Sequence, residues 1–117
     1  MKQIWVVSAD WKFRALVRAE LRERGYEARG YENLTSAAGE VSPGARLPAA
    51  LVLDASDADA AIVSEEIGNW ARRLPALVVV SGAQASFRPP AGVHVLRRPV
   101  RIDEVVAQVV ECAGGSE

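Results

Sequence analysis

Short runs of apolar residues alternate along this chain with longer amphipathic stretches. Four of the runs are rich in β-branched side chains, and they lie at residues 4–7, 50–53, 77–80 and 93–96. The first three are apolar at nearly every position, as parallel strands covered on both faces are. A weaker strand is predicted near residues 27–29. The pattern therefore predicts five strands.

The stretches between these runs have the apolar spacing of helices. The first of these stretches places four apolar side chains on one face of a predicted helix, namely Phe13, Leu16, Val17 and Leu21. Asp10 precedes it as a candidate N-cap, and Gly25 suits a left-handed stop just past its end. Further helices are predicted over residues 34–41, 63–74 and 102–110.

The alternation of strands and helices predicts the fold class. A β-α-β-α-β-α-β order, followed by a fifth strand and a last helix, implies right-handed crossovers and an α/β doubly wound parallel sheet. We expect one domain over residues 1–113, followed by a tail or the start of a linker at residues 114–117.

The amino-acid composition and the net charge limit the classes of function and partner that we expect. The chain has 117 residues, half of them hydrophobic and a quarter charged, which is typical of a globular domain. The net charge of −1 provides no basic field, so neither nucleic acid nor a membrane is expected as a partner. The single cysteine, Cys112, excludes an internal disulfide. The first apolar run is too short for a signal peptide or a membrane span, so we expect a cytoplasmic protein.

Candidate chemistry gathers at the carboxyl ends of the predicted strands. In open parallel sheets, ligands bind outside these ends, where the strand order reverses. The residues found there are Ser8, Ala9 and Asp10 after the first strand, Asp54 after the third, Ser81 after the fourth and Arg98 after the fifth. No glycine-rich turn follows the first strand, which argues against a dinucleotide site.

Four segments together resemble the receiver domains of two-component response regulators. They are residues 4–7 with the following helix up to Glu27, then 48–54, 77–82 and 92–99. The resemblance implies a flavodoxin-like five-stranded sheet in the order 2-1-3-4-5. It implies that Asp54 is the phosphoacceptor position, that Ser81 and Arg98 are phosphoryl-contact positions, and that the bond before Pro99 is cis. Residues 82–92 are too short and too proline-rich for the family's fourth helix, which we expect to be shortened or missing.

The sequence departs from this family where a metal would bind. The family carries two adjacent acids after the first strand, and these positions correspond to Ser8 and Ala9, which have no carboxylate. Magnesium prefers hard oxygen ligands, and the nearby Asp10 is better explained as a helix cap. We therefore expect no metal and no cofactor. Arg98 stands where the family has lysine, and the two side chains are not interchangeable.

These departures predict a degenerate receiver, a signalling module that acts through protein–protein contacts without aspartyl phosphorylation and is not an enzyme. Its partner would be a histidine kinase, an output domain or a second copy of the chain. One alternative is an atypical but active receiver that is phosphorylated on Asp54 by a histidine kinase and uses Mg²⁺. Another is a small-molecule binding module that uses the same edge of the sheet.

Three structural expectations follow. Asp54 and Arg98 should form an ion pair, because a carboxylate without a metal still needs a partner. Ser81, like most serines at strand ends, should bond to the local backbone. A missing fourth helix should leave an apolar interface patch at Phe87, Val93 and Val95, unless the preceding loop packs fully over it.

Overall fold

A computed structural model of the protein describes residues 2–41, 46–55, 60–82 and 89–114. The strands are β1 (Gln3–Val7), β2 (Glu27–Tyr31), β3 (Ala50–Asp54), β4 (Leu77–Ser81) and β5 (Val93–Arg97). The helices are α1 (Trp11–Glu23), α2 (Leu34–Ala38), α3 (Ala60–Ala71) and α4 (Ile102–Gly114).

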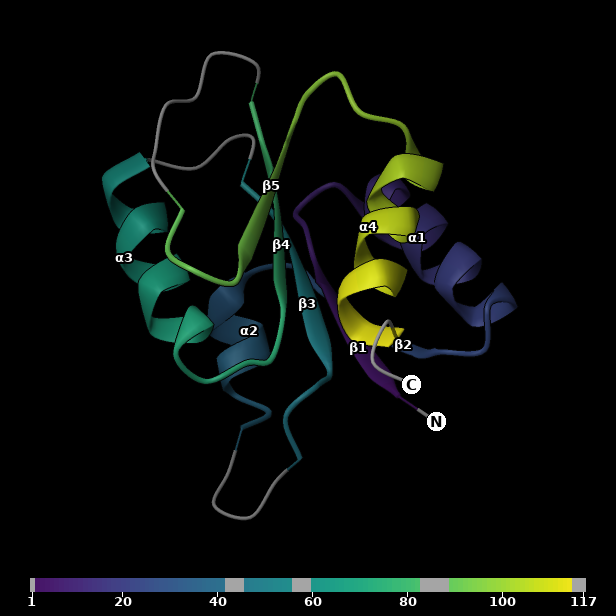
Figure 1. The fold of residues 1–117 in the computed structure, drawn as a ribbon, viewed down its shortest axis with the longest axis horizontal. Helices are drawn as coiled ribbons and strands as arrows, with labels where there is room; N and C mark the ends of the chain where they lie inside the picture. Colours follow the sequence, from purple (N-terminus) through teal and green to yellow (C-terminus); the bar gives the residue numbers. More distant parts are fainter. Residues whose placement is uncertain (1, 42–45, 56–59, 83–88, 115–117) are drawn as a thin grey trace.

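The five strands form one parallel sheet in the order β2-β1-β3-β4-β5. This order confirms the predicted doubly wound, flavodoxin-like architecture. Helices α1 and α4 cover one face of the sheet, and α2 and α3 cover the other (Figure 1). Among the described residues no helix lies between β4 and β5, in agreement with the prediction of a shortened or missing fourth helix.

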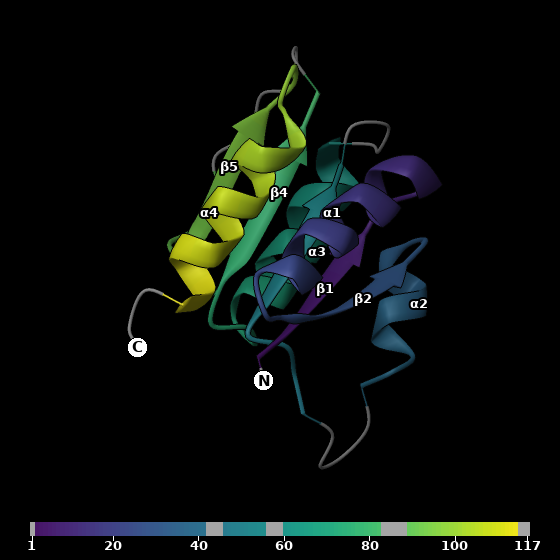
Figure 2. The ribbon, with the colours of Figure 1, turned by 90° about the vertical axis from the view of Figure 1, so that its right-hand side faces the viewer.

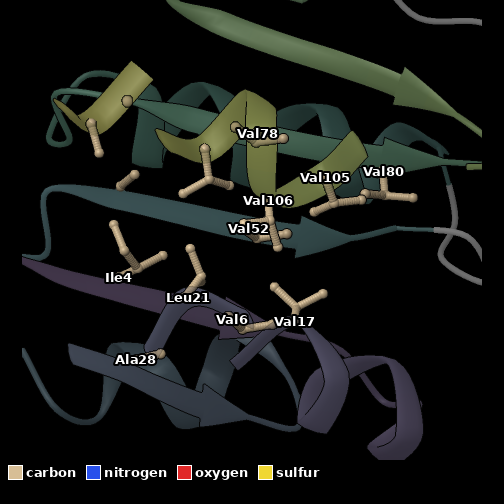
Figure 3. Packing of buried hydrophobic residues seen from close by; sticks show 14 of the residues in the cluster. Ile4, Val6, Val17, Leu21, Ala28, Val52, Val78, Val80, Val105 and Val106 are labelled. Carbon is tan, nitrogen blue, oxygen red and sulfur yellow. The ribbon is translucent and has the colours of Figure 1, made fainter. Parts of the chain in front are cut away.

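The face under α1 and α4 is packed with aliphatic side chains. Val17 and Leu21 of α1 and Val105 and Val106 of α4 are fully buried there (Figure 3). They meet the inward side chains of the central strands, which are Ile4, Val6, Val52, Val78 and Val80. Burial of this kind is the main favourable term in folding.

The opposite face has an aromatic core. Trp5 of β1 and Trp70 of α3 are buried, with their ring centroids 6.3 Å apart. Tyr31 of β2 packs edge-on against Trp5 at 5.1 Å. Edge-to-face pairs at these separations add to the stabilisation that comes from area burial alone. Trp5 and Trp70 therefore serve in packing.

Helix α1 begins and ends at the predicted signals. The Asp10 carboxylate accepts the backbone N–H groups of Lys12 and Phe13, and Gly25 adopts a φ of 91° just past the helix. The prediction that Leu16 faces the core is wrong, because its side chain is 49% exposed. The buried stripe centres on Val17, and Leu16 lies about 100° around the helix from it.

Two other predictions need correction. Helix α2 ends at Ala38, three residues before the predicted end at residue 41. Val93 is buried in the aromatic core and Val95 is half-buried against it, so Val93 offers no surface to a partner. Phe87 lies outside the described residues, and its interface role stays a prediction. Within the described parts of the chain, no helix is long and apolar enough to cross a membrane.

Candidate functional site

The predicted residues meet at the carboxyl edge of the sheet, around Asp54. Asp54 is the last residue of β3, and its side chain is only 8% exposed. Its Oδ2 atom accepts a hydrogen bond from Ser8 Oγ at 2.7 Å and another from Arg98 Nη2 at 3.2 Å. The predicted Asp54–Arg98 ion pair is therefore confirmed.

Ser8 contributes more than the sequence indicated. Its hydroxyl donates to Asp54 and also accepts the backbone N–H of Asp10 at 3.1 Å. Its own backbone N–H donates to the Tyr31 carbonyl at 3.0 Å, and its carbonyl accepts from Arg14 Nη1 at 2.6 Å. We predicted Ser8 only as a lost acid. The register of β1 and β3, which pairs Val7 with Leu53, places residue 8 beside Asp54 and could have revealed this bond.

Arg98 makes contacts through both its side chain and its backbone. Its guanidinium carbon lies 5.2 Å from the centroid of the Phe13 ring, within the range of a cation–π contact. Its backbone N–H donates to the Ser81 carbonyl at 2.9 Å, which fixes the end of β5 against β4. The Arg98–Pro99 peptide bond is cis, as the family resemblance implied. The guanidinium is thus placed between a carboxylate and an aromatic face.

In the part of the chain that the structure describes, the Ser81 hydroxyl does not form the backbone hydrogen bond that we predicted for it. The residue is 2% exposed, and its hydroxyl has no hydrogen-bond partner among the described residues. The prediction of a local backbone bond is therefore wrong. A buried polar group without a partner costs about 1–3 kcal/mol, and such groups in native proteins often mark a functional position.

The residues at this edge do not fit a magnesium ion. Ala9 supplies no oxygen from its side chain, and the Asp10 carboxylate caps α1. The Asp54 Oδ2 atom already contacts the Arg98 cation. In the described part of the chain, no three His, Cys, Asp or Glu side chains lie close enough together to hold a metal ion.

A cavity of about 600 Å³ opens beside Asp54, toward α2 and α3. Val7, Leu34 and Leu53 contribute apolar surface to it. Its carboxylates come from Asp10, Glu32, Asp54 and Glu66, and no basic residue is among the described residues that line it. Its size falls within the range of small-molecule sites.

Solved structures of receiver domains resemble this fold over nearly the whole chain. The receiver domain of the Francisella response regulator 1452 is 15% identical, with a TM-score of 0.74 and complete coverage of both chains. The receiver domain of the hybrid histidine kinase CckA is 18% identical, with a TM-score of 0.70, and covers 95% of this chain and 98% of its own.

A third similar structure is the response regulator TrrA from Thermotoga maritima in complex with Mg²⁺ and BeF. It is 22% identical, with a TM-score of 0.68, and the match covers 96% of this chain and 99% of that one. No family model matches the chain, and no curated protein matches it in sequence. At these identities the likeness establishes the fold.

Proposed function

We propose that this protein is a receiver-like signalling module that acts by protein–protein interaction without phosphorylation of Asp54. The fold supports the first half of this proposal, since the similar structures are receiver domains of response regulators and of a hybrid histidine kinase. A histidine kinase or an output domain is the corresponding class of partner. The contacts of Asp54 with Ser8 and Arg98 support the second half, that Asp54 is not phosphorylated.

The observation that carries the proposal is the closed network at Asp54. One carboxylate oxygen accepts from both Ser8 and Arg98, and the positions that would hold a metal are a serine and an alanine. Phosphoryl transfer depends on cations that offset the charge of the moving group. Here the Arg98 charge is already engaged by the carboxylate itself, so Asp54 serves as a structural ion-pair partner.

One observation favours the alternative of an active receiver. The unpartnered Ser81 hydroxyl belongs to the residue whose carbonyl accepts the Arg98 backbone N–H. In that alternative, a histidine kinase passes a phosphoryl group to the Asp54 carboxylate, and Ser81 and Arg98 contact its oxygens. The Arg98–Asp54 pair would have to open first.

Binding of beryllofluoride, a stable mimic of the phosphoryl group, tests the proposal. Trp5 and Trp70 are buried and Trp11 is 68% exposed next to Asp10, so tryptophan fluorescence contains a solvent-sensitive contribution from the edge of the site. We expect no saturable change when Mg²⁺ is added with beryllofluoride. A saturable change that disappears in Asp54→Asn would overturn the proposal and support the alternative.

A further inference from the structure

One face of α1 carries a row of arginines that ends in an exposed tryptophan. Trp11, Arg14, Arg18 and Arg22 follow one another at spacings of three, four and four residues, which places them on the same side of the helix. We call these four residues the α1 stripe. Helix α1 lies beside β2, the edge strand of the sheet (Figure 2). Arg18 and Arg22 of the stripe reach Ala28 of this strand.

The arginines of the α1 stripe are anchored to the backbone. Arg18 Nε and Arg22 Nη2 both donate to the Ala28 carbonyl at 3.3 Å, and Arg14 Nη1 donates to the Ser8 carbonyl. The Cδ atoms of Arg14 and Arg18 lie 2.9 Å from where a side chain on Gly30 would begin. The side-chain stems therefore lie against Gly30, and each guanidinium keeps further donors for a ligand.

The three arginines of the α1 stripe place like charges one helical turn apart. In the described ranges, no carboxylate forms an ion pair with Arg14, Arg18 or Arg22. Burial lowers the pKa of Arg18, and repulsion from Arg22 and Arg14 lowers it further. Three like charges one helical turn apart are unfavourable on their own, so an anionic ligand would relieve the repulsion.

Trp11 adds an apolar anchor at one end of the row. Its side chain is 68% exposed, the largest exposure among the big apolar residues that the structure describes. Tryptophan and arginine are enriched among the residues that carry most of the energy of protein interfaces. Within the described residues, this exposed tryptophan thus lies in line with arginines that form no ion pair.

We propose that the α1 stripe binds an acidic segment of a protein partner. Acidic side chains about 6 Å apart, as on successive turns of a helix, match the spacing of the three arginines, and an apolar side chain packs on Trp11. A long polyanion such as duplex DNA fits less well. Beyond Trp11 it would approach the Asp10 carboxylate, which lines a cavity together with Glu32 and Glu66.

The two arginines substituted in the test are separate from the chemistry of Asp54. Arg14 donates to the Ser8 carbonyl, but Arg18 and Arg22 donate to the Ala28 carbonyl of β2. Loss of Arg18 and Arg22 would leave the Asp54 carboxylate with its Ser8 and Arg98 partners, and phosphorylation of Asp54 would leave the arginines in place. Failure of this inference would therefore not affect the proposed function.

The experiment measures binding of a fluorescent helical peptide that carries glutamates one turn apart and one leucine. Fluorescence anisotropy at low salt should show saturable binding that weakens as salt rises. The double variant Arg18→Gln/Arg22→Gln should weaken binding by about tenfold or more, and Trp11→Ser by several-fold. The matched control Arg72→Gln/Arg101→Gln removes the same charge from other exposed sites and should bind within about twofold of the wild type.

Circular dichroism first shows that each variant is folded. If Arg18→Gln/Arg22→Gln does not fold, the single variants Trp11→Ser and Arg22→Glu carry the test in its place, because both positions are exposed. Equal losses in the α1 stripe variant and in the control would show a nonspecific charge effect and overturn the proposal. The proposal would also be overturned by retained binding in both variants, by equal binding of a peptide with glutamine in place of glutamate, or by tighter binding of a duplex oligonucleotide of equal charge.

Discussion

The two faces of the sheet are covered in different ways. On one face, α1 and α4 contribute thirteen residues each and pack aliphatic side chains onto the strands. On the other, α2 has five residues and α3 has twelve, and Trp5 and Trp70 are buried among aliphatic side chains with Tyr31 packed against them. The 600 Å³ cavity also lies toward α2 and α3. In the described ranges, the second face thus combines shorter helices with two buried tryptophans.

Asp54 lies at the boundary between these two regions. Its partner Arg98 makes a cation–π contact with Phe13, which is buried in the core under α1 and α4, while the cavity begins on the other side of Asp54. The carboxylate is therefore linked through Arg98 to the face under α1 and α4.

The largest effect is expected from the aromatic core. Trp70→Ala should lower the free energy of unfolding by about 3–5 kcal/mol, because it leaves a large cavity under short helices. Urea unfolding followed by far-UV circular dichroism measures this. The control Trp11→Ala, at an exposed position, should change stability by about 0.5 kcal/mol or less. Similar values for both variants would show that the second face does not depend on its aromatic core.

A smaller effect is expected at the ion pair. Arg98→Ala should lower the free energy of unfolding by about 1–3 kcal/mol, since it removes a charged partner from the nearly buried Asp54. Arg101→Ala removes an arginine whose contacts with Asp103 and Glu104 are exposed, and it should cost about 0–1 kcal/mol. Equal effects in urea unfolding would mean that the Asp54 pair behaves as a surface contact.

The smallest stability change is expected at the helix cap. Asp10→Ala should cost about 1 kcal/mol, because two N–H groups at the start of α1 lose their acceptor. Asp10→Ser retains a capping oxygen and should recover most of this loss. If Asp10 instead holds a metal, added Mg²⁺ will raise the melting temperature of the wild type but not of Asp10→Ser.

Burial on both faces explains why the sequence predicts most of the fold. Central strands such as residues 50–53 are apolar at every position, because helices cover both of their sides. The edge strand β2 was harder to delimit, since only Ala28 is buried within it. The exposure of Leu16 depends on how α1 is rotated against the sheet, which helical spacing alone does not define.

The strand order predicts which residues of the candidate site lie near one another, but it does not predict all of their contacts. Parallel topology brings the ends of β3 and β5 to one edge, so the Asp54–Arg98 pair could be anticipated. The Ser8 bond was missed because we compared that position with an acid and did not consider its hydroxyl. The unpartnered state of Ser81 depends on side-chain orientation and on close neighbours in space, which a single sequence does not reveal.

Phosphorylation of Asp54 is the most direct test of the account. The protein would be incubated with acetyl phosphate and Mg²⁺, and its intact mass measured, with Asp54→Asn as the control. We expect no phosphoryl adduct, because Ser8 and Arg98 already occupy the carboxylate and positions 8 and 9 supply no metal acid. A phosphoryl adduct that forms on the wild type and is absent from Asp54→Asn would contradict the central claim.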